Sequence, residues 1–121
     1  MSTISTHVLD TVLGKLAASV DVRLERLLGG WVGEGTERVD CSEWIQIATG
    51  VTDEDGRCRG LKCDATKGIY RITFVTGSYM RRSNRVSIYP EISITFDCDG
   101  DGHYHLPLLL SDNSYTTYRG S

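Results

Sequence analysis

Two histidines near the C-terminal end stand at the spacing that places side chains on one face of a strand. They are His103 and His105, in the segment 103–110, and residues i and i+2 of a strand point the same way. Because histidine changes charge near neutral pH, such a pair suits a general base with an orienting partner. With a third ligand it would suit zinc, and His7 is the one other histidine in the chain. The same spacing also fits two polar residues on a solvated face.

Arg57 is the cation whose position the sequence predicts best. It follows Asp55 and Gly56, a pair typical of hairpin turns because both residue types tolerate a positive φ. The turn delivers Arg57 close to a strand end, where its guanidinium can hold an anion through paired hydrogen bonds. One arginine and three histidines suit a hydrolase that activates water with a general base. Their spacing in the sequence does not by itself bring them together.

Two other patterns predict structure rather than a site. The segment 97–102 imitates the start of an EF-hand loop, but the twelfth position, which needs a glutamate, is Leu108. Cys58 and Cys63 have the wrong spacing for a zinc knuckle or a redox dithiol. We therefore expect a polar hairpin loop at 97–102, and reduced thiols in a reducing compartment.

Length and composition are those of one soluble domain that spans residues 1–121. Of the 121 residues, 40% are hydrophobic and 24% are charged, and the net charge is −3, which suits a chain with one buried core. The acidic balance gives no basis for binding nucleic acid or an anionic membrane. We find no long apolar run near the N-terminus and no stretch of about 18 apolar residues, so we expect no secretory signal and no membrane span. We expect a cytoplasmic protein, or a peroxisomal one if the source is a eukaryote.

Alternating and β-branched segments predict seven or eight short strands separated by turns. In the first strand, 2–10, His7 shares a face with Ser5, while Thr6 and Val8 take the other face. Further strands are expected at 20–27, 43–49, 68–75, 86–97 and within 103–121, with a short helix in 76–85, and the segment 59–67 is ambiguous. This pattern is typical of an antiparallel β-sandwich.

The proline at position 107 limits how its strand can pair. Pro107 has no N–H to donate to a neighbouring strand. The segment 103–110 is therefore expected at the edge of a sheet, or bulged at the proline.

Four stretches of the chain match the motifs of one known family. They are STHVLD around His7, TDEDGR ending at Arg57, YPE at 89–91, and HYHLPLLLS followed by YTTYRGS at 103–121. The chain thus resembles the 5-hydroxyisourate hydrolases, the transthyretin-related enzymes of urate breakdown, from residue 4 to residue 121. The YRGS ending separates these hydrolases from transthyretin proper, which resembles them in fold but carries thyroid hormone.

The chain departs from the family pattern at three places. The segment 29–41 is longer than the usual hairpin, Val51 stands where many members have a basic residue, and the turn at 111–114 has a different sequence. None of these changes touches the three histidines, Arg57 or the YRGS ending.

The resemblance implies an all-β fold, a transthyretin-like sandwich of two four-stranded antiparallel sheets with one short helix at 76–82. It also implies a homotetramer, built as a dimer of dimers, with the active sites in a channel between the dimers. Residues from two subunits would then meet in one site. This would explain how Tyr118 and Ser121, which lie on opposite faces of an ideal strand, could share it.

The reaction that the resemblance implies is hydrolysis of 5-hydroxyisourate to 2-oxo-4-hydroxy-4-carboxy-5-ureidoimidazoline, with no cofactor and no metal. His7 and His105 would activate or position the water, with His103 beside them. Arg57 would bind the substrate oxygens and stabilise developing negative charge. Tyr118 would contact the substrate, and Ser121 would orient a histidine. Which histidine is the base stays open. Two alternatives also stay open: a transthyretin-like carrier of small ligands without catalysis, and a zinc hydrolase that uses the three histidines.

Overall fold

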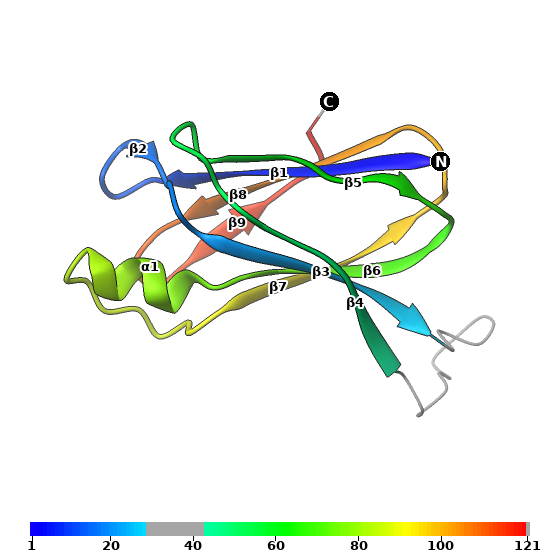
Figure 1. The fold of residues 1–121 in the computed structure, drawn as a ribbon. Helices are drawn as coiled ribbons and strands as arrows, with labels where there is room; N and C mark the ends of the chain where they lie inside the picture. The colour runs from blue at the N-terminus through cyan, green and yellow to red at the C-terminus, as the bar shows by residue number, and fades with distance from the viewer. Residues whose placement is uncertain (29–42, 121) are drawn as a thin grey trace.

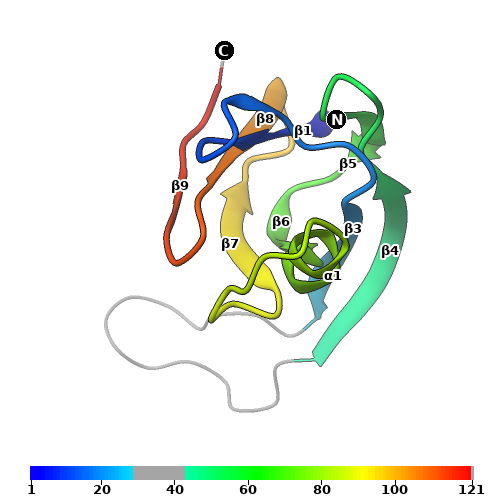
Figure 2. The ribbon, with the colours of Figure 1, turned by 90° about the vertical axis from the view of Figure 1, so that its left-hand side faces the viewer.

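Two β-sheets pack face to face in the computed structural model, which describes residues 1–28 and 43–120. Figure 1 shows the layers from the side and Figure 2 from one end. The first sheet contains β1 (Ser2–Asp10), β2 (Lys15–Leu16), β5 (Arg57–Ala65), β8 (His103–Leu110) and β9 (Tyr115–Thr117). The second contains β3 (Asp21–Leu28), β4 (Glu43–Val51), β6 (Gly68–Phe74) and β7 (Ile92–Cys98). The helix α1 (Thr76–Arg82) lies at one end of the sandwich.

The expected sandwich with one short helix is confirmed, and two details of the first sheet differ. This sheet has five strands rather than four, because the short β2 pairs with the end of β1 beside β5. It is also mixed rather than antiparallel, because β1 and β8 run parallel to each other. Alternation in a sequence shows which face a residue occupies, but it does not show the direction of the neighbouring strand. The segment 29–41, which was expected to form a longer loop, lies outside the described residues.

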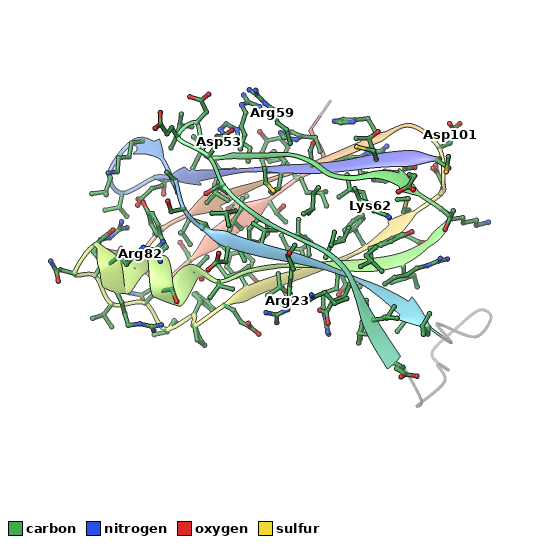
Figure 3. All side chains as sticks on the ribbon, in the orientation of Figure 1. Arg23, Asp53, Arg59, Lys62, Arg82 and Asp101 are labelled. Atoms are coloured by element: carbon green, nitrogen blue, oxygen red, sulfur yellow. The ribbon has the colours of Figure 1, made fainter. Side chains whose placement is uncertain are left out.

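The buried faces of the strands form one core between the sheets. Ile4 and Val8 of β1 and Tyr70, Ile72 and Phe74 of β6 are at most 1% exposed, as their alternation predicts. Full burial of one such aliphatic or aromatic side chain stabilises the fold by roughly 1.5–3 kcal/mol. Charged side chains project outward around this core, among them those labelled in Figure 3 (Arg23, Asp53, Arg59, Lys62, Arg82 and Asp101). The inward side chains of β1 thus hold the strand against the core, and its outward side chains are free to form a site.

The expectation that Pro107 lies on an edge strand or at a bulge was wrong, because β8 is an inner strand whose pairing with β1 runs through Pro107 without a register shift. β8 lies between β1 and β9. β9 pairs with Leu108–Leu110, and Gly120 forms an isolated bridge to His105 in the same register. No pairing is formed between these two points, where Pro107 would stand opposite Tyr118. The proline is tolerated inside the sheet because it stands in this gap of the ladder.

A buried polar cluster joins the end of β1 to the helix. The Asp10 side chain is fully buried; it accepts a hydrogen bond of 2.7 Å from the Tyr79 hydroxyl and pairs with the Arg85 guanidinium. Burial acts to raise the pKa of Asp10, but the hydrogen bonds from Arg85 and Tyr79 outweigh it and hold that pKa below its usual value. Asp10 is therefore ionised, and it anchors the strand that carries His7.

Within the described residues, no helix is long and apolar enough to cross a membrane.

Candidate active site

The site residues come from three neighbouring strands, with β1 in the middle. On one side, His7 of β1 pairs directly with Arg57 of β5. On the other side, Ser5 of β1 pairs with His105 of β8. Residues directly opposite each other on paired strands point to the same face. The three histidines and Arg57 therefore gather on the outward face of the first sheet, although up to about a hundred residues separate them in the sequence.

The turn before Arg57 connects β4 of the second sheet to β5 of the first, so it is not the hairpin that the sequence predicted. The Asp53 carboxylate accepts hydrogen bonds from the backbone N–H groups of Asp55 and Arg57, at 2.8 and 3.0 Å. Gly56 has a φ of 71°, and a Cβ added there would lie 2.5 Å from the carbonyl oxygen of Val8. Only glycine fits this close approach to β1, so a turn at Asp55-Gly56 is confirmed, although it joins two sheets, and it fixes where Arg57 begins its strand.

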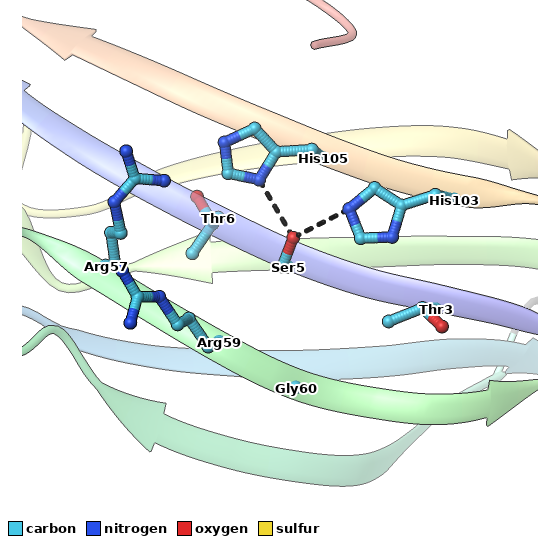
Figure 4. A pocket seen from close by; sticks show the side chains of 8 residues that line it. All are labelled: Thr3, Ser5, Thr6, Arg57, Arg59, Gly60, His103 and His105. Carbon is cyan, nitrogen blue, oxygen red and sulfur yellow. Dashed lines mark hydrogen bonds between the residues drawn. The ribbon is translucent and has the colours of Figure 1, made fainter. Parts of the chain in front are cut away.

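A bulge in β5 opens a cavity beside these residues. Thr6 pairs with Cys58, but Ile4 pairs with Lys62, so β5 carries two more residues than β1 over this interval. Gly60, inside the bulge, has a φ of 60°. The cavity has a volume of about 280 Å³. Its lining, shown in Figure 4, consists of Thr3, Ser5, Thr6, Arg57, Arg59, Gly60, His103 and His105.

The two histidines of β8 share a face, as predicted, and Ser5 lies between them (Figure 4). The Ser5 Oγ is 2.8 Å from His105 Nδ1 and 3.4 Å from His103 Nε2. The two imidazole rings are nearly parallel, with centroids 6.2 Å apart. The His7 ring lies 6.4 Å from that of His105 on the other side. His105 is thus the central member of a row of three imidazoles.

His7 stands at the border of the cavity rather than in its lining. Its Nε2 is 3.1 Å from the backbone carbonyl oxygen of Asp55. A carbonyl can only accept, so Nε2 carries a hydrogen and the lone pair of the neutral ring is on Nδ1. Burial and the charge of Arg57 lower the pKa of His7, against the opposing effects of the Asp55 carbonyl and the nearby Asp53 and Asp55 carboxylates.

His105 is also held in its neutral form. Burial lowers its pKa, and the positive charge of Arg57 and the neighbouring His103 and His7 lower it further. A neutral imidazole has a lone pair that can accept a proton from water, as a general base requires. His105 lines the cavity and His7 borders it, so both can act on a molecule bound there.

The cavity also has a cationic side. Arg57 and Arg59 both line it from β5. Among residues 1–28 and 43–120, neither guanidinium takes part in an ion pair. Unpaired guanidinium groups beside neutral imidazoles suit a ligand with electron-rich or anionic oxygens.

The C-terminal segment contacts the backbone of β8 at both of its histidines. The Gly120 N–H donates to the carbonyl oxygen of His105 at 2.7 Å, and the Arg119 guanidinium donates to that of His103 at 3.1 Å. A Cβ at Gly120 would lie 2.9 Å from the His105 ring. Tyr118 is 55% exposed and does not line the cavity. Ser121, assigned a role by its motif, lies outside the described residues.

Five lining residues were missed by sequence reasoning: Thr3, Ser5, Thr6, Arg59 and Gly60. Ser5 was placed on the same face as His7, yet it was not recognised as a partner of the β8 histidines, because that contact depends on the parallel pairing of β1 and β8. Arg59 and Gly60 fall in the segment that the sequence left ambiguous. In the described part of the chain, no three His, Cys, Asp or Glu side chains are grouped so that they could hold a metal ion.

Known proteins resemble this chain over nearly its whole length. The model of the HIUase/Transthyretin family matches residues 4–120. The 5-hydroxyisourate hydrolase of Mus musculus is 37% identical over 123 residues, covering 99% of this chain and 96% of the mouse protein. The 5-hydroxyisourate hydrolase of Salmonella dublin is 40% identical over 121 residues, covering 98% of this chain and 80% of the relative.

Solved structures show the same fold in two kinds of protein. The 5-hydroxyisourate hydrolase of Klebsiella pneumoniae superposes with a TM-score of 0.80 at 34% identity, covering 100% of both chains. Transthyretin from Sparus aurata superposes with a TM-score of 0.82 at 32% identity, covering 98% of this chain and 96% of the other. The fold therefore does not separate the two kinds of protein, and the distinction depends on the side chains at the site.

Proposed function

This chain belongs to the HIUase/Transthyretin family, and we propose that it hydrolyses 5-hydroxyisourate to 2-oxo-4-hydroxy-4-carboxy-5-ureidoimidazoline in urate degradation. The observation that carries the proposal is the gathering of His105, His103 and Arg57 around one cavity, with His7 at its border. The curated relatives at 37% and 40% identity are named 5-hydroxyisourate hydrolases.

The reaction opens a six-membered ring at an amide bond. Water attacks the C6 carbonyl carbon while a neutral imidazole accepts its proton. The C6–N1 bond then breaks, N1 takes a proton from the imidazolium, and C6 becomes a carboxylic acid that releases its proton to solvent to give the carboxylate. General-base assistance of this kind contributes about 10²–10⁴-fold to the rate. His105 and His7 are the candidate bases, because the pKa of each is lowered and each is neutral at pH 7.

Arg57 supports the step electrostatically. Negative charge grows on the carbonyl oxygen as water adds, and a preorganised cation stabilises that charge more than it stabilises the uncharged substrate. Arg57 lines the cavity beside His105 and is oriented by the rigid turn that precedes it. His103 supports His105 through Ser5, Tyr118 contacts the substrate, and Ser121 orients a histidine. The last two roles come from the family motif.

A carrier of small ligands is the second candidate, and the TM-score of 0.82 with Sparus aurata transthyretin favours it. A carrier does not need neutral imidazoles in a row beside two unpaired arginines, and it does not need the YRGS ending. Turnover separates the two functions directly, because a carrier would bind a ring compound without opening it.

We further propose a cofactor-independent homotetramer, built as a dimer of dimers, in the cytoplasm. The strands β7 and β9 end their sheets, so their outer edges offer unpaired backbone groups for pairing with a second copy. The described cysteines Cys58, Cys63 and Cys98 are free thiols, which suits a reducing compartment. Light scattering on the purified protein tests the assembly, and localisation in its native cell distinguishes the cytoplasm from a peroxisome.

The deciding experiment is an ultraviolet decay assay. Urate is oxidised enzymatically to 5-hydroxyisourate, and its spontaneous decay is compared with decay in the presence of the protein. We expect the protein to accelerate the decay in proportion to its concentration, with no loss of rate after incubation with a chelator. Decay at the spontaneous rate would refute the hydrolase, and loss of activity with the chelator would favour the zinc alternative.

A further inference from the structure

The Ser5 hydroxyl is placed to determine which nitrogen of His105 carries a proton. Its Oγ lies 2.8 Å from His105 Nδ1 and 3.4 Å from His103 Nε2. Ser5 as a whole residue is only 8% exposed, so few water molecules compete for these contacts. Because Ser5 and His105 are directly paired on parallel strands, their separation is fixed by the sheet and not by a flexible loop.

Only two proton arrangements satisfy the shorter contact. A hydroxyl has one hydrogen to donate and can accept as well. If Ser5 donates to His105 Nδ1, the neutral ring carries its hydrogen on Nε2 and offers no lone pair to the cavity. If His105 Nδ1–H donates to Ser5, the lone pair lies on Nε2, and the Ser5 hydrogen is available for His103 Nε2.

The surrounding charges favour the second arrangement. In Figure 4, the His105 nitrogen that does not face Ser5 is turned to the side on which Arg57 lies. A lone pair is the negative end of the neutral ring, so it is stabilised on the side facing a guanidinium, whereas an N–H is repelled there. The second arrangement also gives the Ser5 hydrogen an acceptor in His103. The first arrangement can also meet the His103 contact, with His103 Nε2–H donating to Ser5, so the position of Arg57 decides between the two.

We propose that Ser5 is a positioning residue that holds His105 in the tautomer protonated at Nδ1, which leaves the Nε2 lone pair directed into the cavity as the base. The inference rests on the proposed hydrolase function for its kinetic consequence, but not for the tautomer itself. It also assigns the base to His105 rather than to His7, whose Nε2 is held by the Asp55 carbonyl.

The tautomer can be read without substrate. In full-length protein labelled with ¹⁵N-histidine, the ring-nitrogen shifts of His105 are identified by their loss in His105→Gln. We expect a protonated Nδ1 and an unprotonated Nε2 in the wild type near neutral pH. A wild-type His105 protonated at Nε2 would overturn the proposal, whether or not the protein hydrolyses 5-hydroxyisourate.

Three variants test the kinetic consequence. Ser5→Ala should lower kcat about fivefold to tenfold with KM little changed, since one net hydrogen bond is lost from the reacting arrangement. Ser5→Thr keeps a hydroxyl on the strand and should recover most of kcat. Ser2→Ala is the matched control, because the buried Ser2 Oγ on the same strand has no hydrogen-bond partner among the described residues.

The charged and titratable groups around His105 are constant in this series: His7 on β1, His103 on β8, and Arg57 and Arg59 on β5. A role limited to packing predicts equal losses in Ser5→Ala and Ser2→Ala, without a change of tautomer. Wild-type kcat in Ser5→Ala would contradict the positioning role. If neither the wild type nor any variant hydrolyses 5-hydroxyisourate, the proposed function is refuted. The tautomer proposal is then decided by the ¹⁵N measurement alone.

Discussion

His7 and Arg57 face each other directly across β1 and β5, so an imidazole and a guanidinium leave the sheet side by side. The contact has an electrostatic consequence, because after burial the charge of Arg57 is the largest factor that lowers the pKa of His7. At His105 the charge of Arg57 is likewise the largest factor after burial that lowers the pKa. One arginine therefore does two things at this site: it keeps two candidate bases unprotonated, and it offers a cation to the substrate.

Replacing Arg57 should damage catalysis far more than folding. We expect Arg57→Ala to lower kcat/KM by about 10²–10³, which is the loss typical of removing one preorganised charge stabiliser. Arg57→Lys should recover only part of it, because an ammonium lacks the planar fork of a guanidinium. The decay assay measures the rates, and light scattering checks that the assembly is unchanged. Arg23→Ala is the control. Arg23 lies on the other sheet, where it pairs with Glu91 at the surface, so this variant should retain activity.

The pH profile should have its acid limb below the ordinary histidine range. The pKa values of His7 and His105 are both lowered from 6.5, and a general base is inactive when protonated. The value of kcat/KM should therefore be level above pH 6.5 and fall as pH drops through the lowered pKa of the base. In Arg57→Ala, the loss of positive charge should move the acid limb to higher pH. A limb above pH 6.5 in the wild type, or an unmoved limb in the variant, would contradict this account.

Within the row of imidazoles, His105 should be the member whose loss costs most. We expect His105→Ala to lower kcat by about 10²–10⁴, as for the removal of a general base, and His103→Ala to have a smaller effect, since His103 acts through Ser5. Both side chains leave the outward face of β8, so neither variant should change the thermal midpoint greatly. Equal kcat values for His105→Ala and the wild type would remove His105 from the mechanism.

How far the sequence predicts this site depends on the range of the contact. Alternation placed His7 on one face with Ser5, and the Asp55-Gly56 pair predicted the turn before Arg57. These features depend only on neighbours in sequence, and the structure confirms them. The i, i+2 spacing of His103 and His105 likewise predicted their common face.

The contacts that convert these residues into a site are of long range. The parallel pairing of β1 with β8 joins Ser5 to His105 across a hundred positions, and no periodicity in either strand specifies it. The β5 bulge at Gly60 opens the cavity, although the surrounding segment has no clear strand pattern. The family resemblance placed His7, Arg57, His103 and His105 in one site in advance, but it supplied neither the parallel pairing nor the bulge.

The Asp10 cluster should control the stability of the strand that carries His7. Asp10 is fully buried and Arg85 is 14% exposed at the side chain, so Asp10→Ala leaves a largely buried guanidinium without one of its carboxylates. We expect this to lower the free energy of unfolding by about 3–5 kcal/mol. Tyr79→Phe removes one hydrogen bond to a charged group and should cost about 1.5–3 kcal/mol. The Asp64→Ala control breaks an exposed pair with Lys62 and should leave stability nearly unchanged.

The same cluster predicts a pH dependence of stability with a definite sign. The folded-state pKa of Asp10 is lowered from 3.8, so the folded chain binds the proton less readily than the unfolded chain does. The stabilisation is therefore complete above the unfolded pKa and is lost as pH falls below 3.8 through the folded value. Urea unfolding between neutral pH and the acid range should show a steeper loss of stability in the wild type than in Asp10→Asn, which has no carboxylate to protonate. Parallel curves for the two proteins would show that Asp10 does not contribute to acid unfolding.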